Sequence, residues 1–270
     1  MNPRPLGDAL SLHRAGRLPE AEAGYRAIIA ASADPDAMQL LASLLHQDGR
    51  SHEALAWLDR ALPQLARRDA AESNRAAMLL ALDRFDEARA SAEQVLARNP
   101  QHAGAVHNRR LALLGQARAA GELLAKARYY ASYVAAGGDD PGAFLDYGNV
   151  LQNIGAAEEA IAAFERAAAL VPSAVGPASP RAQIAGLTER AGDFPRALRE
   201  LTSLVADDHT NIDAARRLVP LAKRLGDQSA LALAYDRIVT LDPFDAATHS
   251  AYGRLAVEKR DMALAAREFR

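Results

Sequence analysis

The chain has 270 residues, of which half are apolar, and its formal net charge is −2 with a pI of about 6.4. This near balance of charge gives no overall field that would attract nucleic acid or a membrane surface. There is no Cys, which excludes disulfides and cysteine-based catalytic or metal sites. No segment approaches the length of a membrane span, and the N-terminus lacks the apolar run of a signal peptide, so we expect a cytoplasmic protein.

The sequence predicts pairs of short amphipathic helices that follow one another along the whole chain. In most pairs a turn residue, usually Gly or Asp, is followed five residues later by a small residue. The fourth pair fits worst: its second helix is expected near residues 120–136, ending at Gly137-Gly138, and its small-residue position is only interpolated at Leu124. In chain order the predicted pairs cover residues 4–33, 36–68, 70–101, 103–138, 141–174, 179–209, 212–244 and, in part, 246–270.

The clearest copy of this unit lies at residues 144–172. Its key positions are Phe144, Tyr147-Gly148, Leu151, Gly155, Ala160, Phe164 and Pro172. This pattern resembles the tetratricopeptide repeat, a helix–turn–helix unit with a period of 34 residues. The small-residue positions of the other pairs repeat at nearly that period, at Ala21, Ala54, Ala88, Ala197, Leu231 and Ala265. The resemblance implies an all-α fold, a right-handed α-solenoid (superhelix) of antiparallel helix pairs.

Stacking explains why the pattern recurs, because one helix pair cannot bury its apolar stripe alone. Small residues such as Ala54 and Ala160 are expected to let helices approach closely, while Tyr25, Phe164 and Tyr235 fill the space between units. Trp57 is expected to pack between helices and not to act as a binding anchor.

Three irregularities interrupt the array. Residues 172–180 read PSAVGPASP and predict a loop or a local hinge. Pro220 falls inside a predicted first helix, which we expect it to kink or break. The last helix ends uncapped at Arg270, so we expect the sequence to be a truncated one.

No motif for catalysis or cofactor binding is present. No two His residues have the spacing of a metalloprotease site, and there is no phosphate-binding Gly-rich loop or nucleophile elbow. Glu158-Glu159 is expected to complement a helix start, and Asp207-Asp208 to lie in a loop. We therefore expect no enzyme activity, no metal and no cofactor.

Polar residues on the first helices are the better candidates, since the resemblance implies that these helices line a concave groove that binds peptides. Asn74 and Asn108 are 34 residues apart, and Asp146 corresponds to them in the next pair, beside Asn149 and Asn153. An Asn amide both donates and accepts hydrogen bonds, which suits an extended peptide backbone. The alternative is a solvated polar face. The remaining residues that the register projects onto this face are Gln39, Ser43, Gln47, His107, Leu111 and Gln152.

A basic set on the seventh pair is the second candidate. Arg217 and Arg224 share one face and could take a carboxylate or phosphate; the alternative is again a solvated face. Arg216 and Lys223 share another face, and Arg190 and Arg254 lie at related places in the flanking pairs. The family's clamp for chaperone tails is not expected, because its Lys positions carry other residues, such as Leu145 beside Asn149.

These observations predict a non-catalytic scaffold or adaptor that binds a peptide segment or partner protein in the concave groove, with no role in binding nucleic acid or membranes. One alternative is a targeting or regulatory arm of a larger transferase or hydrolase. The other is a self-assembling solenoid that forms homo-oligomers through its repeat ends.

Overall fold

The computed structural model describes residues 5–270, and every regular element in that span is a helix. The predicted all-α repeat fold is thus confirmed. The first four pairs are α1 (Pro5–Arg14) with α2 (Leu18–Ser32), α3 (Pro35–Gln47) with α4 (Ser51–Ala61), α5 (Asp69–Leu80) with α6 (Phe85–Arg98), and α7 (Ala103–Ala119) with α8 (Leu123–Ala135). A short 3-10 helix, Leu62–Gln64, follows α4.

Four further pairs follow. They are α9 (Pro141–Asn153) with α10 (Ala157–Leu170), α11 (Pro180–Ala191) with α12 (Phe194–Asp207), α13 (Ile212–Leu225) with α14 (Gln228–Leu241), and α15 (Ala246–Glu258) with α16 (Met262–Glu268). The predicted first pair begins at residue 4, which lies outside the described residues.

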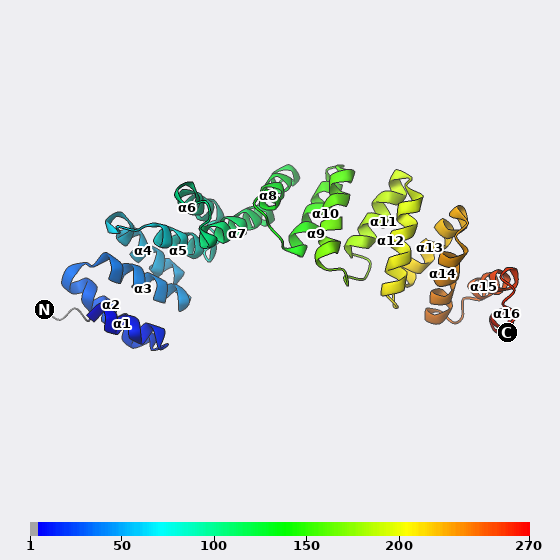
Figure 1. The fold of residues 1–270 in the computed structure, drawn as a ribbon, viewed down its shortest axis with the longest axis horizontal. Coiled ribbons are helices and arrows are strands. Elements are labelled where there is room, and N and C mark those ends of the chain that lie inside the picture. Colours follow the sequence, from blue (N-terminus) through cyan, green and yellow to red (C-terminus); the bar gives the residue numbers. More distant parts are fainter. Residues whose placement is uncertain (1–4) are drawn as a thin grey trace. The chain divides into compact units, whose positions relative to one another are not determined.

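The chain divides between Gly138 and Asp139 into two compact units. Unit 1 holds α1 to α8 and unit 2 holds α9 to α16. Within each unit every helix packs against the next one along the chain (Figure 1). The predicted right-handed superhelix concerns the whole chain and stays a prediction.

Most helix pairs turn through one residue with left-handed backbone geometry. Between α9 and α10 this residue is Gly155, with φ +83°, and Asp83 (φ +55°) and Arg260 (φ +61°) adopt the same geometry without being glycine. The other such turns use Gly16, Gly49, Gly192 and Gly226. Among the eight links inside the helix pairs of residues 5–270, only the one from α7 to α8 lacks a left-handed residue.

Buried small residues recur at one position of the second helices. In six of the eight second helices of residues 5–270 the fourth residue is a buried Ala, and these are Ala21, Ala54, Ala88, Ala160, Ala197 and Ala265. Leu231 holds this place in α14 and is half-buried. Lys126 holds it in α8, and the interpolated Leu124 is 61% exposed, so that assignment was wrong. The helix starts later than the period predicts because α7 is longer than its counterparts.

The large residues lie where the pattern predicts. Tyr25, Phe164 and Tyr235 are buried as predicted, and the ring of Phe164 lies against Gly148 within its own helix pair. Trp57 is partly buried against the core of unit 1, and the guanidinium of Arg60 lies 4.5 Å from its ring centroid.

Pro220 does not break its helix. Helix α13 runs without interruption from Ile212 to Leu225, so the predicted break is wrong. Proline removes only the amide that would donate to the carbonyl of Arg216, and the buried residues Leu218, Leu221 and Ala222 hold the helix on both sides of it. The predicted loop at 172–180 lies within unit 2, between the end of α10 and the start of α11.

Candidate functional site

The residues predicted to bind a partner all lie on first helices of the pairs: α5, α7, α9 and α13. The left-handed turn residues give them a common register. Asn74 lies nine residues before Asp83, Asp146 nine before Gly155, and Arg217 nine before Gly226. These three side chains therefore occupy one equivalent helix position, and Arg217 joins a series that the sequence had assigned only to Asn74, Asn108 and Asp146.

Asn108 has a structural role in unit 1. Its side chain is 7% exposed, and its Nδ2 donates to the carbonyl oxygen of Ser73 at 2.7 Å. This bond joins α7 to α5, so the Asn108 amide is used inside the fold. Asn74 is half-buried, and no hydrogen-bond partner for its side chain is found in residues 5–270.

Helix α9 presents an exposed polar face in unit 2. Asp146, Asn149 and Asn153 are all exposed, and their spacing of three and four residues places them on one side of the helix. Beside them, Gln152 Oε1 is buried with no donor in the described structure. This face therefore offers amide donors and acceptors to a ligand.

Gly186 of α11 lies next to arginine side chains from α11 and α13. A Cβ added to Gly186 would lie 3.7 Å from Arg190 Nη1 and 3.8 Å from Arg217 Nη2. By its distance to the turn, Gly186 corresponds to Asn149, since each lies six residues before its left-handed glycine, Gly192 or Gly155. The bare backbone of Gly186 therefore lies close to two guanidinium groups.

The Arg217 guanidinium forms an ion pair with Glu189 within unit 2. Its Nη2 lies 3.2 Å from Glu189 Oε1, but the geometry is not that of a hydrogen bond, and this buried oxygen accepts none. Arg224 is stacked on an aromatic ring instead, with its guanidinium carbon 3.7 Å from the centroid of Phe194. Both cations are thus positioned by unit 2 while remaining at least partly exposed.

The other predicted cations of this region differ in their contacts. Arg216 pairs with Asp242 at 3.1 Å, and Lys223 lies 5.8 Å from the ring centroid of Tyr235. Both contacts are with residues of the α13–α14 pair and of its following loop, so this second face packs within its own repeat. Arg190 and Arg254 are exposed.

Charge changes along the first helices of unit 2. On α9 the exposed face carries Asp146 and two amides, whereas α11, α13 and α15 contribute Arg190, Arg217, Arg224 and Arg254. Such an arrangement suits a ligand with a neutral part and an acidic part, because the cations gather at one end.

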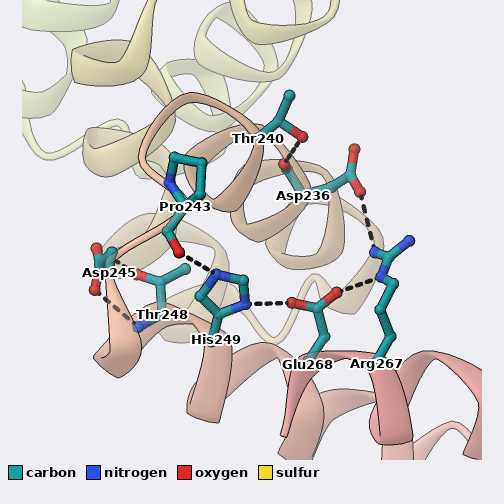
Figure 2. A network of polar contacts seen from close by, with 8 residues as sticks. All are labelled: Asp236, Thr240, Pro243, Asp245, Thr248, His249, Arg267 and Glu268. Atoms are coloured by element: carbon teal, nitrogen blue, oxygen red, sulfur yellow. Dashed lines mark hydrogen bonds and ion pairs between the residues drawn. The ribbon is translucent and has the colours of Figure 1, made fainter. Parts of the chain in front are cut away.

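A polar network that the sequence did not reveal closes the last helix pair (Figure 2). Glu268 is buried, and its two oxygens contact His249 Nδ1 at 2.7 Å and Arg267 Nε at 2.6 Å. His249 Nε2 lies 3.1 Å from the carbonyl oxygen of Pro243, and Arg267 lies 3.9 Å from Asp236 of α14. The network fastens α16 to the preceding repeat. No sequence motif indicated it, because His249 and Glu268 lie 19 residues apart on different helices.

Residues 5–270 contain neither a cluster of metal-ligand side chains nor a membrane-spanning helix. No three side chains of the His, Cys, Asp or Glu type converge as metal ligands would. None of the described helices combines the length and the apolar character that crossing a bilayer requires.

No known family profile matches the sequence, and no curated protein matches it. The C-terminal part of a tetratricopeptide-repeat protein from Cytophaga hutchinsonii has a similar structure, with a TM-score of 0.54 and 14% identity over 90% of this chain and 97% of that one. The fold is that of the tetratricopeptide-repeat proteins. At this identity the likeness concerns the fold alone.

Two further solved structures resemble this chain less closely, with TM-scores below 0.5. MamA from Desulfovibrio magneticus RS-1 gives a TM-score of 0.38 at 22% identity, covering 55% of this chain and 82% of that one. A tetratricopeptide protein of Thermus thermophilus gives 0.34 at 17% identity, covering 83% and 100%.

Proposed function

We propose that this tetratricopeptide array is a non-catalytic scaffold that binds an extended segment of a partner protein along the first helices of unit 2. The observation that carries the proposal is the position of Gly186 beside the guanidinium groups of Arg190 and Arg217. Because this residue has no side chain, a ligand backbone can approach the helix next to two cations.

The chemistry of the face supports a directional ligand. Asn149 and Asn153 offer amides that both donate to and accept from a peptide backbone. An acidic side chain or the C-terminal carboxylate of the ligand would lie toward Arg217 and Arg224. Charge-assisted hydrogen bonds to these cations are stronger than hydrogen bonds between neutral groups.

The proposed binding face contains four of the sequence-predicted residues, which are Asn149, Asn153, Arg217 and Arg224. Asn108 is left out because its amide is bonded to Ser73. Asn74 belongs to unit 1, so it is not part of the proposed face of unit 2.

A displayed library of random peptides tests the proposal. Enriched peptides are measured by fluorescence anisotropy against wild type, N149A/N153A, R217Q/R224Q and the control R199Q, whose arginine is exposed on the second helix α12. We expect acidic peptides, and a loss of about tenfold or more in R217Q/R224Q, since each lost charge-assisted bond removes about 1.5–3 kcal/mol. Equal affinity for R217Q/R224Q and R199Q would refute the site.

Two alternatives remain distinguishable by other measurements. Self-association through the repeat ends predicts a mass that rises with protein concentration in light scattering. A targeting arm of a larger transferase or hydrolase predicts a catalytic domain in the same reading frame beyond Arg270.

A further inference from the structure

Unit 1 departs from the repeat pattern at the link between α7 and α8. This link, Ala120-Gly121-Glu122, has no left-handed residue, and α7 has 17 residues against 12 in α5. The C-terminal end of α7 therefore extends beyond the place where the other first helices of the unit stop. Two adjoining pockets lie here, against the start of α6.

The first pocket is an apolar slot of about 490 Å³. Leu114 is buried at its base, while Leu111 is 41% exposed beside it. Gly115 has no side chain, and the ring of Phe85 lies against its Cα and forms one wall. The residues that line the slot are Leu80, Phe85, Leu111, Leu114, Gly115, Arg118 and Ala119.

The second pocket, of about 550 Å³, is lined by carboxylates. It shares Phe85 and Ala119 with the slot, so the two pockets are immediate neighbours. Its charged lining consists of four carboxylates and one guanidinium, which are Asp83, Asp86, Glu87, Glu122 and Arg84.

The carboxylates of this pocket differ in what satisfies them. Glu87 is paired with Arg84, whose Nη2 lies 2.7 Å from its Oε2, and Asp86 accepts from the buried amide of Gln116. Asp83 and Glu122 are exposed, and no hydrogen bond or ion pair to either side chain is found in residues 5–270. Two negative charges therefore face the solvent directly beside an apolar slot.

We propose that these two pockets together bind a partner polypeptide through one aliphatic or aromatic side chain next to a Lys or Arg. The apolar side chain enters the slot against Leu111 and Leu114, and the cation faces Asp83 and Glu122. Both pockets have the size of natural ligand sites, which is about 300–1,000 Å³. Charge complementarity selects the basic neighbour, because carboxylates outnumber the lining cations Arg84 and Arg118 by two to one.

This proposal does not rest on the proposed function, because it uses none of the residues of unit 2. The two sites also prefer opposite charges in their ligands, so each can fail without the other.

Short synthetic peptides test the proposal on the full chain. The probe is acetyl-Gly-Ser-Leu-Lys-Ser-Gly-amide, and its two counterparts replace Leu by Ser or Lys by Glu. Binding is followed by methyl NMR. We expect the Leu-Lys peptide to shift the methyl signals of Leu80, Leu111 and Leu114, and the Lys-to-Glu peptide to bind about fivefold more weakly or worse. Equal shifts with Leu-Lys and Leu-Glu, or shifts that leave these leucines unchanged, would overturn the proposal.

Protein variants separate the two pockets. Leu111→Gln is at an exposed position, and Asp83→Asn with Glu122→Gln removes both charges while keeping a side chain tolerant of the left-handed region at residue 83. Leu111→Gln should lose the Leu-Lys response, D83N/E122Q should weaken it by up to about fivefold, and the control E158Q/E159Q at the start of α10 should retain it. Full binding by D83N/E122Q would contradict the proposal.

A second copy of the chain is a different occupant of the same slot. Sedimentation velocity over a concentration series detects it. A mass that rises with concentration in wild type and stays monomeric in Leu111→Gln would assign the slot to self-association and overturn the proposal of a basic partner segment.

Discussion

His249 Nδ1 lies 2.7 Å from Glu268 Oε2, and the Glu268 side chain is only 2% exposed. The other ring nitrogen faces the carbonyl oxygen of Pro243, so both partners of the ring are acceptors. Both ring nitrogens of His249 therefore lie within hydrogen-bond distance of an acceptor oxygen. Arg267 contributes a cation to the same carboxylate.

Removing Glu268 should loosen the last helix pair. In Glu268→Ala the His249 ring and the Arg267 guanidinium lose their shared carboxylate, and losing a hydrogen bond to a charged group costs about 1.5–3 kcal/mol. The loss should be local, because each repeat depends on its neighbours. Hydrogen exchange followed by mass spectrometry should show faster exchange in α15 and α16, with α1 to α8 unchanged.

The exposed Glu158→Ala on α10 provides the control for that measurement, and it should leave the exchange of α15 and α16 as in wild type. If the hydrogen-exchange protection of α16 is unaltered in Glu268→Ala, the polar network does not stabilise this helix, and its apolar contacts hold it in place.

Overpacking should distinguish the two faces of α10. Ala160 is fully buried and is the fourth residue of its helix, whereas Ala162 is exposed on the same helix. Ala160→Leu forces extra methylene groups into a close helix contact and should cost about 1–3 kcal/mol. Ala162→Leu should change stability by no more than about 0.5 kcal/mol. Chemical denaturation monitored by circular dichroism compares the two, and equal midpoints would contradict the packing register.

Acid should weaken unit 2 through Asp208. Burial acts to raise the pKa of this carboxyl, but hydrogen bonds from the Thr210 amide at 3.1 Å and hydroxyl at 2.9 Å outweigh it and hold the pKa below its usual value of 3.8. Since the folded pKa is below the unfolded one, the carboxylate stabilises the fold at higher pH, and this contribution is lost as pH falls through the folded pKa.

The measurement for Asp208 is the free energy of unfolding as a function of pH in wild type and Asp208→Asn. The difference between them should be constant near neutral pH and shrink below about pH 4. The exposed Glu258→Gln serves as the comparison variant. A difference that stays constant down to about pH 2 would show that Asp208 does not carry the acid sensitivity.

The sequence predicted the parts of the fold that repeat. Gly148 illustrates why: a Cβ there would lie 2.5 Å from the Phe164 ring, so the glycine and the aromatic residue form one packing unit within a single pair. Such short-range requirements recur about every 34 residues and can be seen in one sequence. Ala160 and Tyr25 were identified for the same reason.

The wrong predictions concern positions whose burial or conformation depends on contacts that the repeat pattern does not include. Asn108 has the register of a surface residue, but it is buried because Ser73 of the preceding pair accepts its hydrogen bond. Leu124 was assigned by extrapolating the period across a link whose length differs. Pro220 leaves its helix unbroken because buried neighbours hold the chain on both sides, which helix propensity alone does not include. The pockets beside α7 follow from that same altered link and were not predicted.

The shared left-handed turn has a consequence for how such an array evolves. Seven helix pairs in the described chain reverse through the same backbone geometry, so duplicating or exchanging one of them needs no redesign of its hairpin. The α7–α8 hairpin lacks this left-handed turn residue, and two pockets lie beside it. Both pockets are lined by residues of the α5–α6 pair as well as of the α7–α8 pair, so a genetic copy would keep them only if the two pairs were duplicated together.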